Sequence, residues 1–294
     1  MTRQPGEHLV RLYPEIGLAG SLQAAMQTAL DHAGYELTAV LTSAPGWWDC
    51  ATRVGDAHRH VSVNAGSQQR WFLMEFWDRG VMMAKAKTGD LSAAAEAIGL
   101  WQAGSRLREL KAACLFVEYG PLAEAHERGD AVEAKWAIYR NTSAPHVDHD
   151  LIEAAYAQPR LRALFPFHSH RSLHFSRCTG FPYTHDIPVI GPRPDGTYRV
   201  VWWQVRSPHG PAIGEVDNPH DAIALVIAHL PADCGSAVAG TPPTLTDRIP
   251  RNDAVDVALP EGWDGRGDDP AGGAVRVAQR RIGRRAASTR GNRG

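Results

Sequence analysis

A plan of short strands, a capped turn and a helix occurs twice in this chain, near residues 58–103 and 172–230. In each copy, alternating apolar and polar residues predict strands, and Gly, Pro, Asn and Asp supply the turns between them. Strands joined by such short turns pair most economically as antiparallel meanders. The residues of the two copies do not align, so we interpret them as halves of similar build and not as a sequence repeat.

The boundaries follow from the two hydrophobic periods. We predict strands at 58–63, 71–77 and 81–86 in the first half and at 172–177, 197–205 and 211–216 in the second. Helical periodicity predicts helices at 21–33, 91–103, 105–114, 121–128, 131–140, 151–164 and 220–230. Ser21 is the expected N-cap of the first helix, and Pro159 is expected to break the helix that contains it.

These elements predict an α+β protein with two antiparallel meander-plus-helix halves, a helical middle segment and a disordered C-terminal tail. Residues 8–150 form the expected N-terminal meander and helical region. Residues 151–239 form a second meander-plus-helix region, either separate from the first or continuous with it. Residues 240–294 are the expected tail, because Gly, Pro, Asp and Arg dominate there and Trp263 is its one aromatic residue.

Composition narrows the class of protein. The 44% of hydrophobic and 21% of charged residues are typical of a soluble globular protein, and the formal net charge of −1 gives no general attraction to nucleic acid. Only the Arg-rich end predicts a weak nucleic-acid contact. No signal-peptide core and no run of ~20 apolar residues is present, so we expect a cytoplasmic protein without a membrane partner. The four scattered cysteines favour reduced thiols.

Reactive side chains are densest between Phe165 and Pro188. This segment contains His168, His170, His174, Cys178, His185 and Asp186. On an extended strand, Leu173 and Phe175 share the core face and His174 projects from the other face. The simplest interpretation is structural: His174 and Cys178 pack half-buried, and His168 and His170 lie in a surface loop. That interpretation needs neither a metal nor any other cofactor.

Two chemical interpretations stay open beside it. A strand continued back from His174 would place His168 and His170 on the same face, and neutral imidazoles in that arrangement suit zinc or iron. Alternatively, Cys178 acts as a nucleophile assisted by His174 or His185. Asp186 would then orient the base.

A binding role needs fewer assumptions. Four arginines lie in or beside the same region, and guanidinium groups recognise carboxylates and phosphates. They are Arg160, Arg162, Arg171 and Arg177, of which Arg171 and Arg177 are nearest the histidines. Together with His168 and His170 these two are the candidate binding residues of this segment. We expect a solvated rim unless other residues fix these side chains toward one point.

Three segments resemble a known family. They are LRELKAACLFVEYGPLAEAHERG at 107–129, AAYAQPRLRALFPFHSHRSLHFSRCTGFPYTHDIP at 154–188 and AIALVIAHLPADCGSAVAG at 222–240. They resemble an actinobacterial family of unknown function whose members are labelled natural-product biosynthesis proteins, and the resemblance spans residues 10–240. The label implies a biosynthetic neighbourhood, but it implies no reaction, cofactor or catalytic residue.

Two hypotheses for function follow. We favour a non-catalytic accessory or binding protein that acts on a partner protein or a small metabolite, because no nucleophile or metal set stands at a recognisable spacing from an orienting partner. The alternative is a Cys/His-dependent or metal-dependent enzyme that uses residues 168–178.

The strand period gives a first prediction. We expect Phe175→Ala to lower the free energy of unfolding by ~3–5 kcal/mol because it empties a core position, and His174→Ala to cost much less. Denaturant unfolding of the two variants measures both values. Equal costs would contradict a strand with one buried face.

Overall fold

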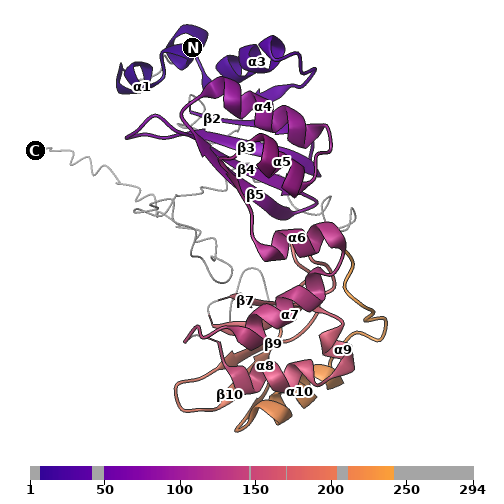
Figure 1. Ribbon diagram of the computed structural model, residues 1–294. Helices are drawn as coiled ribbons and strands as arrows, with labels where there is room; N and C mark the ends of the chain where they lie inside the picture. Colours follow the sequence, from indigo (N-terminus) through magenta and orange to yellow (C-terminus); the bar gives the residue numbers. More distant parts are fainter. Residues whose placement is uncertain (1–6, 42–49, 146, 170, 204–210, 242–294) are drawn as a thin grey trace, which may run out of the picture.

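The computed structural model describes residues 7–41, 50–145, 147–169, 171–203 and 211–241 of the chain (Figure 1). Within these residues the protein is an α+β protein with two antiparallel sheets, as the sequence predicts. Of the tail expected at 240–294, residues 242–294 lie outside the described residues. The expectation is wrong for Gly240 and Thr241, whose amides donate to the Thr179 hydroxyl and the Arg79 carbonyl. No helix in the described ranges is both long and apolar enough to cross a membrane.

The first sheet has its strands in sequence order. They are β1 (Ala39–Leu41), β2 (Ala51–Gly55), β3 (Arg59–Ala65), β4 (Phe72–Asp78), β5 (Val81–Thr88) and β6 (Val117–Glu118). The helices of this half are α1 (Glu7–Leu12), α2 (Pro14–Ala19), α3 (Leu22–His32), α4 (Leu91–Gln102) and α5 (Leu107–Ala113). Helices α3 and α4 pack on the sheet, where the strand period turns Val61, Val63 and Phe76 inward.

The second sheet is also a meander, in the order β11-β10-β9-β8-β7. Its strands are β7 (Phe165–Ser169), β8 (Ser172–Ser176), β9 (Val189–Pro192), β10 (Tyr198–Val201) and β11 (Ala212–Val216). The remaining helices are α6 (Pro121–Arg128), α7 (Ala131–Asn141), α8 (His149–Tyr156), α9 (Pro159–Arg162) and α10 (Pro219–Ala228).

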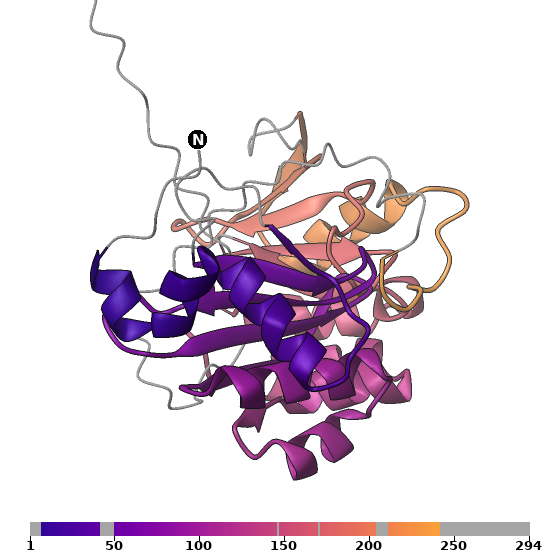
Figure 2. The same ribbon diagram turned by 90° about the horizontal axis from the view of Figure 1, so that it is seen from above.

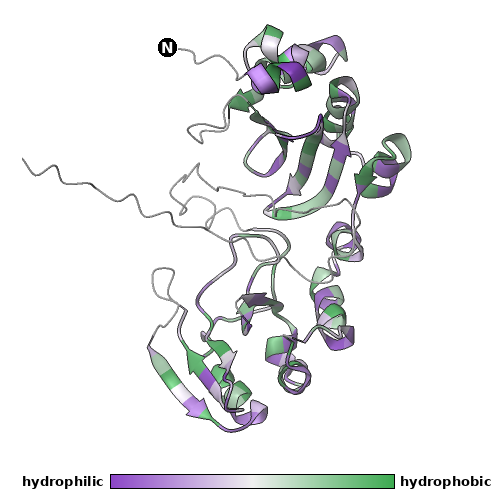
Figure 3. Ribbon diagram, turned by 90° about the vertical axis from the view of Figure 1, so that its left-hand side faces the viewer, coloured by the Kyte–Doolittle hydropathy of each residue, from purple (hydrophilic) through white to green (hydrophobic). Residues whose placement is uncertain are grey.

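Each sheet has its own hydrophobic core. The first core runs from Tyr13 to Ala123, and the second from Trp136 to Leu230. The colouring of Figure 3 shows hydrophobic residues along the strands of both sheets. Helix α7 packs against β7, so Trp136 and Tyr139 belong to the second core although the sequence grouped them with residues 8–150. The boundary between independently folding units stays a prediction.

The two halves meet at the turn between β4 and β5. The carbonyl of Gly80 accepts a hydrogen bond of 2.8 Å from the amide of Phe181, and the carbonyl of Arg79 accepts one of 2.9 Å from Thr241. The Thr241 hydroxyl also donates to the carbonyl of Phe181. Viewed from the N-terminal end in Figure 2, the second half lies beneath the first. The chain that follows α10 therefore returns to the first sheet and closes the joint.

The sequence missed several elements for local reasons. Helices α1 and α2 are six residues each, and α1 buries no residue, so neither has a visible apolar period. Strands β1, β2, β6 and β9 are all five residues or shorter. Strand β7 contains Pro166, a residue that disfavours strands in general, but β7 is at the edge of its sheet, where proline is tolerated. Ser21 caps α3 as predicted, accepting from the amide of Ala24.

We predict that Gly80→Ala destabilises the protein through this joint. Gly80 has a φ of +76°, and a Cβ there would collide with the carbonyl oxygen of Phe181 and the hydroxyl of Thr241. Gly129 is the matched control, because its φ is +92° but no atom lies within 4 Å of a Cβ placed there. Gly129→Ala should cost ~1–2 kcal/mol for the left-handed backbone alone, and Gly80→Ala clearly more. Equal losses in denaturant unfolding would show that the joint is not tightly packed.

Candidate ligand-binding pocket

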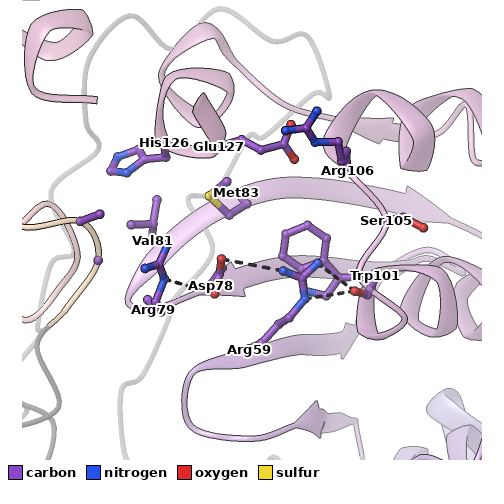
Figure 4. A pocket seen from close by; sticks show the side chains of 13 residues that line it. Arg59, Asp78, Arg79, Val81, Met83, Trp101, Ser105, Arg106, His126 and Glu127 are labelled. Atoms are coloured by element: carbon purple, nitrogen blue, oxygen red, sulfur yellow. Dashed lines mark hydrogen bonds and ion pairs between the residues drawn. The ribbon is translucent and has the colours of Figure 1, made fainter. Parts of the chain in front are cut away.

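A pocket of about 230 Å³ lies beside the joint between the two halves (Figure 4). Its lining residues come from the ends of separate elements. They are Arg59, Asp78, Arg79, Val81, Met83, Trp101, Gly104, Ser105, Arg106, His126, Glu127, Ala239 and Gly240. The first half supplies most of the wall, and the segment that follows α10 supplies the last two residues.

The floor of the pocket is an arginine laid over a tryptophan. The guanidinium carbon of Arg59 lies 3.7 Å from the centre of the Trp101 ring. Its Nε and Nη2 donate to the carbonyl of Trp101 at 3.1 and 2.9 Å, which fixes the plane of the group. Trp101 is 1% exposed, and its indole N–H has no acceptor among the described residues. The floor thus keeps a spare hydrogen-bond donor.

Asp78 is shared between two arginines. Its carboxylate oxygens lie 3.8 Å from Nη1 of Arg59 and 3.8 Å from Nε of Arg79. Both separations are longer than a hydrogen bond, so each guanidinium retains N–H groups for another acceptor. Burial lowers the pKa of Arg59, and the carboxylates of Asp78 and Glu127 oppose this shift.

The opposite wall comes from α6 and the start of α5. Glu127 accepts a hydrogen bond of 2.9 Å from the amide of Leu107, so its carboxylate is partly committed to the N-terminus of α5. Arg106 is exposed and lies beside Glu127 in Figure 4. His126 lies on the same helix, at the end of the pocket near Arg79.

Arginines outnumber carboxylates in this lining. Three guanidinium groups, from Arg59, Arg79 and Arg106, face two carboxylates, from Asp78 and Glu127. Burial, with smaller contributions from the positive charges of Lys135 and Arg79, lowers the pKa of His126 to about 4, so its imidazole is neutral at pH 7. The pocket therefore carries a formal charge of +1 and an excess of donors.

Lys135 adds a buried amine behind His126. It is 6% exposed, and its Nζ lies 4.7 Å from the ring centre of Tyr139 and 6.0 Å from that of Phe165. The ring of His126 packs on the same Phe165, at 5.9 Å between centroids. No carboxylate of the described residues forms an ion pair with Lys135, and burial lowers its pKa to about 8. Positive charge therefore extends into the joint behind the pocket.

The structure places the His-rich segment in a hairpin. Phe167 pairs with His174 and His168 pairs with Leu173, so His168 and His174 project from opposite faces of the sheet. The expected row of three imidazoles on one face is therefore wrong, because the chain reverses between β7 and β8. His170, the third candidate, lies outside the described residues. Among the residues that are described, no three His, Cys, Asp or Glu side chains gather as metal ligands.

His174 is more buried than the sequence suggested. It is 2% exposed, stacks on Phe167 at 4.7 Å and meets Trp203 edge-on at 5.0 Å. Leu173 and Phe175 are buried on the other face, so β8 is covered on both sides. The small cost expected for His174→Ala is therefore revised upward toward that of a core position.

The environment of Cys178 does not favour a nucleophile. Cys178 is fully buried, its thiol donates to the carbonyl of Gly180 at 3.3 Å, and burial raises its pKa, so a thiolate is disfavoured at pH 7. His185 lies against Trp203 at 6.2 Å, and burial lowers its pKa. Asp186 pairs with Arg177 at 2.5 Å.

The candidate binding arginines also lie apart. Arg171, with a φ of +70°, precedes β8, and Arg177 follows it. Arg177 is occupied by Asp186 and, at 3.4 Å, by Asp233. Arg171 and Arg177 therefore sit at opposite ends of a five-residue strand and do not form one site. His168 packs edge-on against Tyr139 at 4.6 Å.

The pocket residues were missed because they have no common spacing. Asp78 and Arg79 fall in the turn between the strands predicted at 71–77 and 81–86, and Arg59 falls inside the strand predicted at 58–63. The one available signal was their position, since all lie at or next to the ends of strands or helices, where functional residues concentrate.

One family model matches part of the chain. Residues 130–241 match the model of a family of unknown function, DUF6193. No curated protein and no solved structure matches the chain. The matched segment runs from the residue before α7 to Thr241, so it covers the second sheet and its helices. Of the pocket lining it contains only Ala239 and Gly240.

The state of His126 predicts a dependence of stability on pH. Its pKa is about 4 in the folded protein and 6.5 ordinarily, so the unfolded chain binds a proton first as the pH falls. Stability contributed by neutral His126 is complete above pH ~6.5 and is lost between ~6.5 and ~4. His60, with a pKa also of about 4, contributes separately.

We expect His126→Gln to lose less stability than the wild type between these pH values. Chemical unfolding at several pH values, with exposed His58→Gln as control, measures the difference. A wild-type slope retained in His126→Gln would contradict a buried neutral imidazole.

Proposed function

We propose that the protein is a non-catalytic binding protein whose pocket holds a small acidic molecule, with a carboxylate or phosphate group as the recognised feature. The observation that carries this proposal is the pocket lining, in which Arg59, Arg79 and Arg106 outnumber the carboxylates. Guanidinium groups bind such anions through paired N–H donors.

Binding is favoured over catalysis by what the lining contains. Ser105 has the one hydroxyl among the described lining residues, and it lies at the far end from His126 in Figure 4. A nucleophile activated by a base needs the two within hydrogen-bond reach. The Cys/His alternative loses support as well, because the Cys178 thiol is buried.

The cellular context of the proposal rests on sequence resemblance. The family resembled by residues 107–129, 154–188 and 222–240 is labelled for natural-product biosynthesis. An accessory protein of such a pathway that binds an acidic metabolite is consistent with the pocket. We keep this association, and a cytoplasmic location, as part of the proposal.

Titration calorimetry tests the pocket with three probes: pyrophosphate, citrate and the uncharged citrate trimethyl ester. We expect saturable binding of at least one anion and none of the ester. Arg79→Gln and Arg106→Gln should each weaken anion binding by about tenfold, the usual size for a charged hydrogen-bonded contact. Both side chains are exposed enough to be replaced without loss of packing.

Arg128→Gln is the matched control. Arg128 is on the same helix as His126, pairs with Asp130 at 3.1 Å and does not line the pocket. Its replacement should leave anion binding unchanged. No saturable binding of either anion, or equal losses in all three arginine variants, would contradict the proposal.

A further inference from the structure

The described chain ends at the rim of the pocket. Ala239 and Gly240 line the pocket, and Gly240 donates from its amide to the hydroxyl of Thr179 at 2.9 Å. Thr241 is 7% exposed and is held by Arg79 and Phe181 through its amide and hydroxyl. Whatever follows Thr241 therefore starts from a fixed point next to Arg79.

The segment that follows is strongly acidic. Between residues 242 and 269 there are seven acidic residues, namely Asp247, Asp253, Asp256, Glu261, Asp264, Asp268 and Asp269. Only three arginines accompany them, Arg248, Arg251 and Arg266, so the segment has a formal charge of −4 (seven negative, three positive). From residue 270 onward the sequence has no acidic residue and seven arginines.

We propose that the acidic segment 247–269 docks into the arginine-lined pocket of its own chain and competes with the acidic ligand. This inference rests on the proposed function, because it assumes that the pocket binds carboxylates. The acidic side chains of segment 247–269 carry carboxylates, the group that Arg59, Arg79 and Arg106 are suited to bind.

The covalent attachment makes this contact effective. Asp247 is six positions beyond Thr241 in the chain, which allows a reach of up to ~20 Å from the rim. A segment tethered so closely has an effective concentration in the millimolar range. Even a weak carboxylate contact is then occupied much of the time, and a free ligand must displace it.

The Arg-rich end of the chain is an alternative partner for the acidic segment. Its seven arginines between 276 and 293 can pair with the same carboxylates, within the tail and away from the pocket. The two arrangements predict different partners for the acidic residues. The pocket arrangement depends on Arg79 and Arg106, whereas the tail arrangement does not.

Calorimetry with pyrophosphate tests the competition in the full-length chain. Replacing the seven acidic residues by Asn or Gln should tighten pyrophosphate binding by about tenfold at low ionic strength. The matched control replaces the seven arginines of 276–293 by Gln, and binding should stay within about twofold of wild type. Equal affinities in the wild type and the acid-neutralised variant would overturn the docked segment.

Fluorine NMR of protein labelled with 5-fluorotryptophan reports where the segment lies. Trp263 lies inside the acidic segment and Trp101 lies in the pocket floor, and Trp263→Phe assigns the first signal. We expect pyrophosphate to shift both signals, and Arg79→Gln with Arg106→Gln to move the Trp263 signal to the same released position without ligand. A Trp263 signal that responds only to the arginine replacements in 276–293 would overturn the proposal in favour of pairing within the tail.

The two proposals fail in different ways. Absence of pyrophosphate binding in both the wild type and the acid-neutralised variant contradicts the function of the pocket itself. Binding in both with equal affinity, and a Trp263 signal that ignores pyrophosphate, contradicts only the docked segment.

Discussion

The pocket depends on one backbone contact, the insertion of the β4–β5 turn between two segments of the second half. Gly80 and Arg79 offer their carbonyls to Phe181 and Thr241, and glycines at the contact let the backbones approach. Gly180, for example, has no room for a Cβ against the carbonyl of Arg79. Because Arg79 also lines the pocket, the same turn sets the orientation of the halves and the position of a binding group.

The electrostatics of the joint are set by two buried basic side chains that have no buried carboxylate beside them among the described residues. His126 and Lys135 both contact Phe165, and both have pKa values held below their ordinary range, chiefly by burial. A buried ammonium without a carboxylate partner costs stability. A fold that keeps such a group next to an arginine-lined pocket has a surplus of positive charge that an acidic ligand would relieve. This surplus is the physical basis of the proposed recognition at the joint, in preference to the His-rich hairpin.

The sequence predicted regular elements well and the pocket not at all. Helix α3 and strands β3 to β5 were predictable because each is long enough to show the periodic spacing of apolar residues that its type requires. Ser21 also marks the start of α3 as its N-cap. Strand β7 was not predicted, because Pro166 is tolerated only at the edge of a sheet and the sequence does not show which strand lies at the edge. Arg59, Arg79 and Arg106 are brought together only by the packing of separate element ends. The reactive segment was visible in sequence, but its hairpin divides the histidines between two faces.

The route of the chain through the joint also orders events during synthesis. Arg79 and Thr241 are neighbours in the fold but are separated by most of the described chain, so their contact has a high loop-closure cost. The first sheet has all its strands by Glu118 and can form while the second half is still being made. The pocket gains its last wall only when Ala239 and Gly240 arrive. Completion of the pocket is thus a late event for the nascent chain, after both cores have their residues.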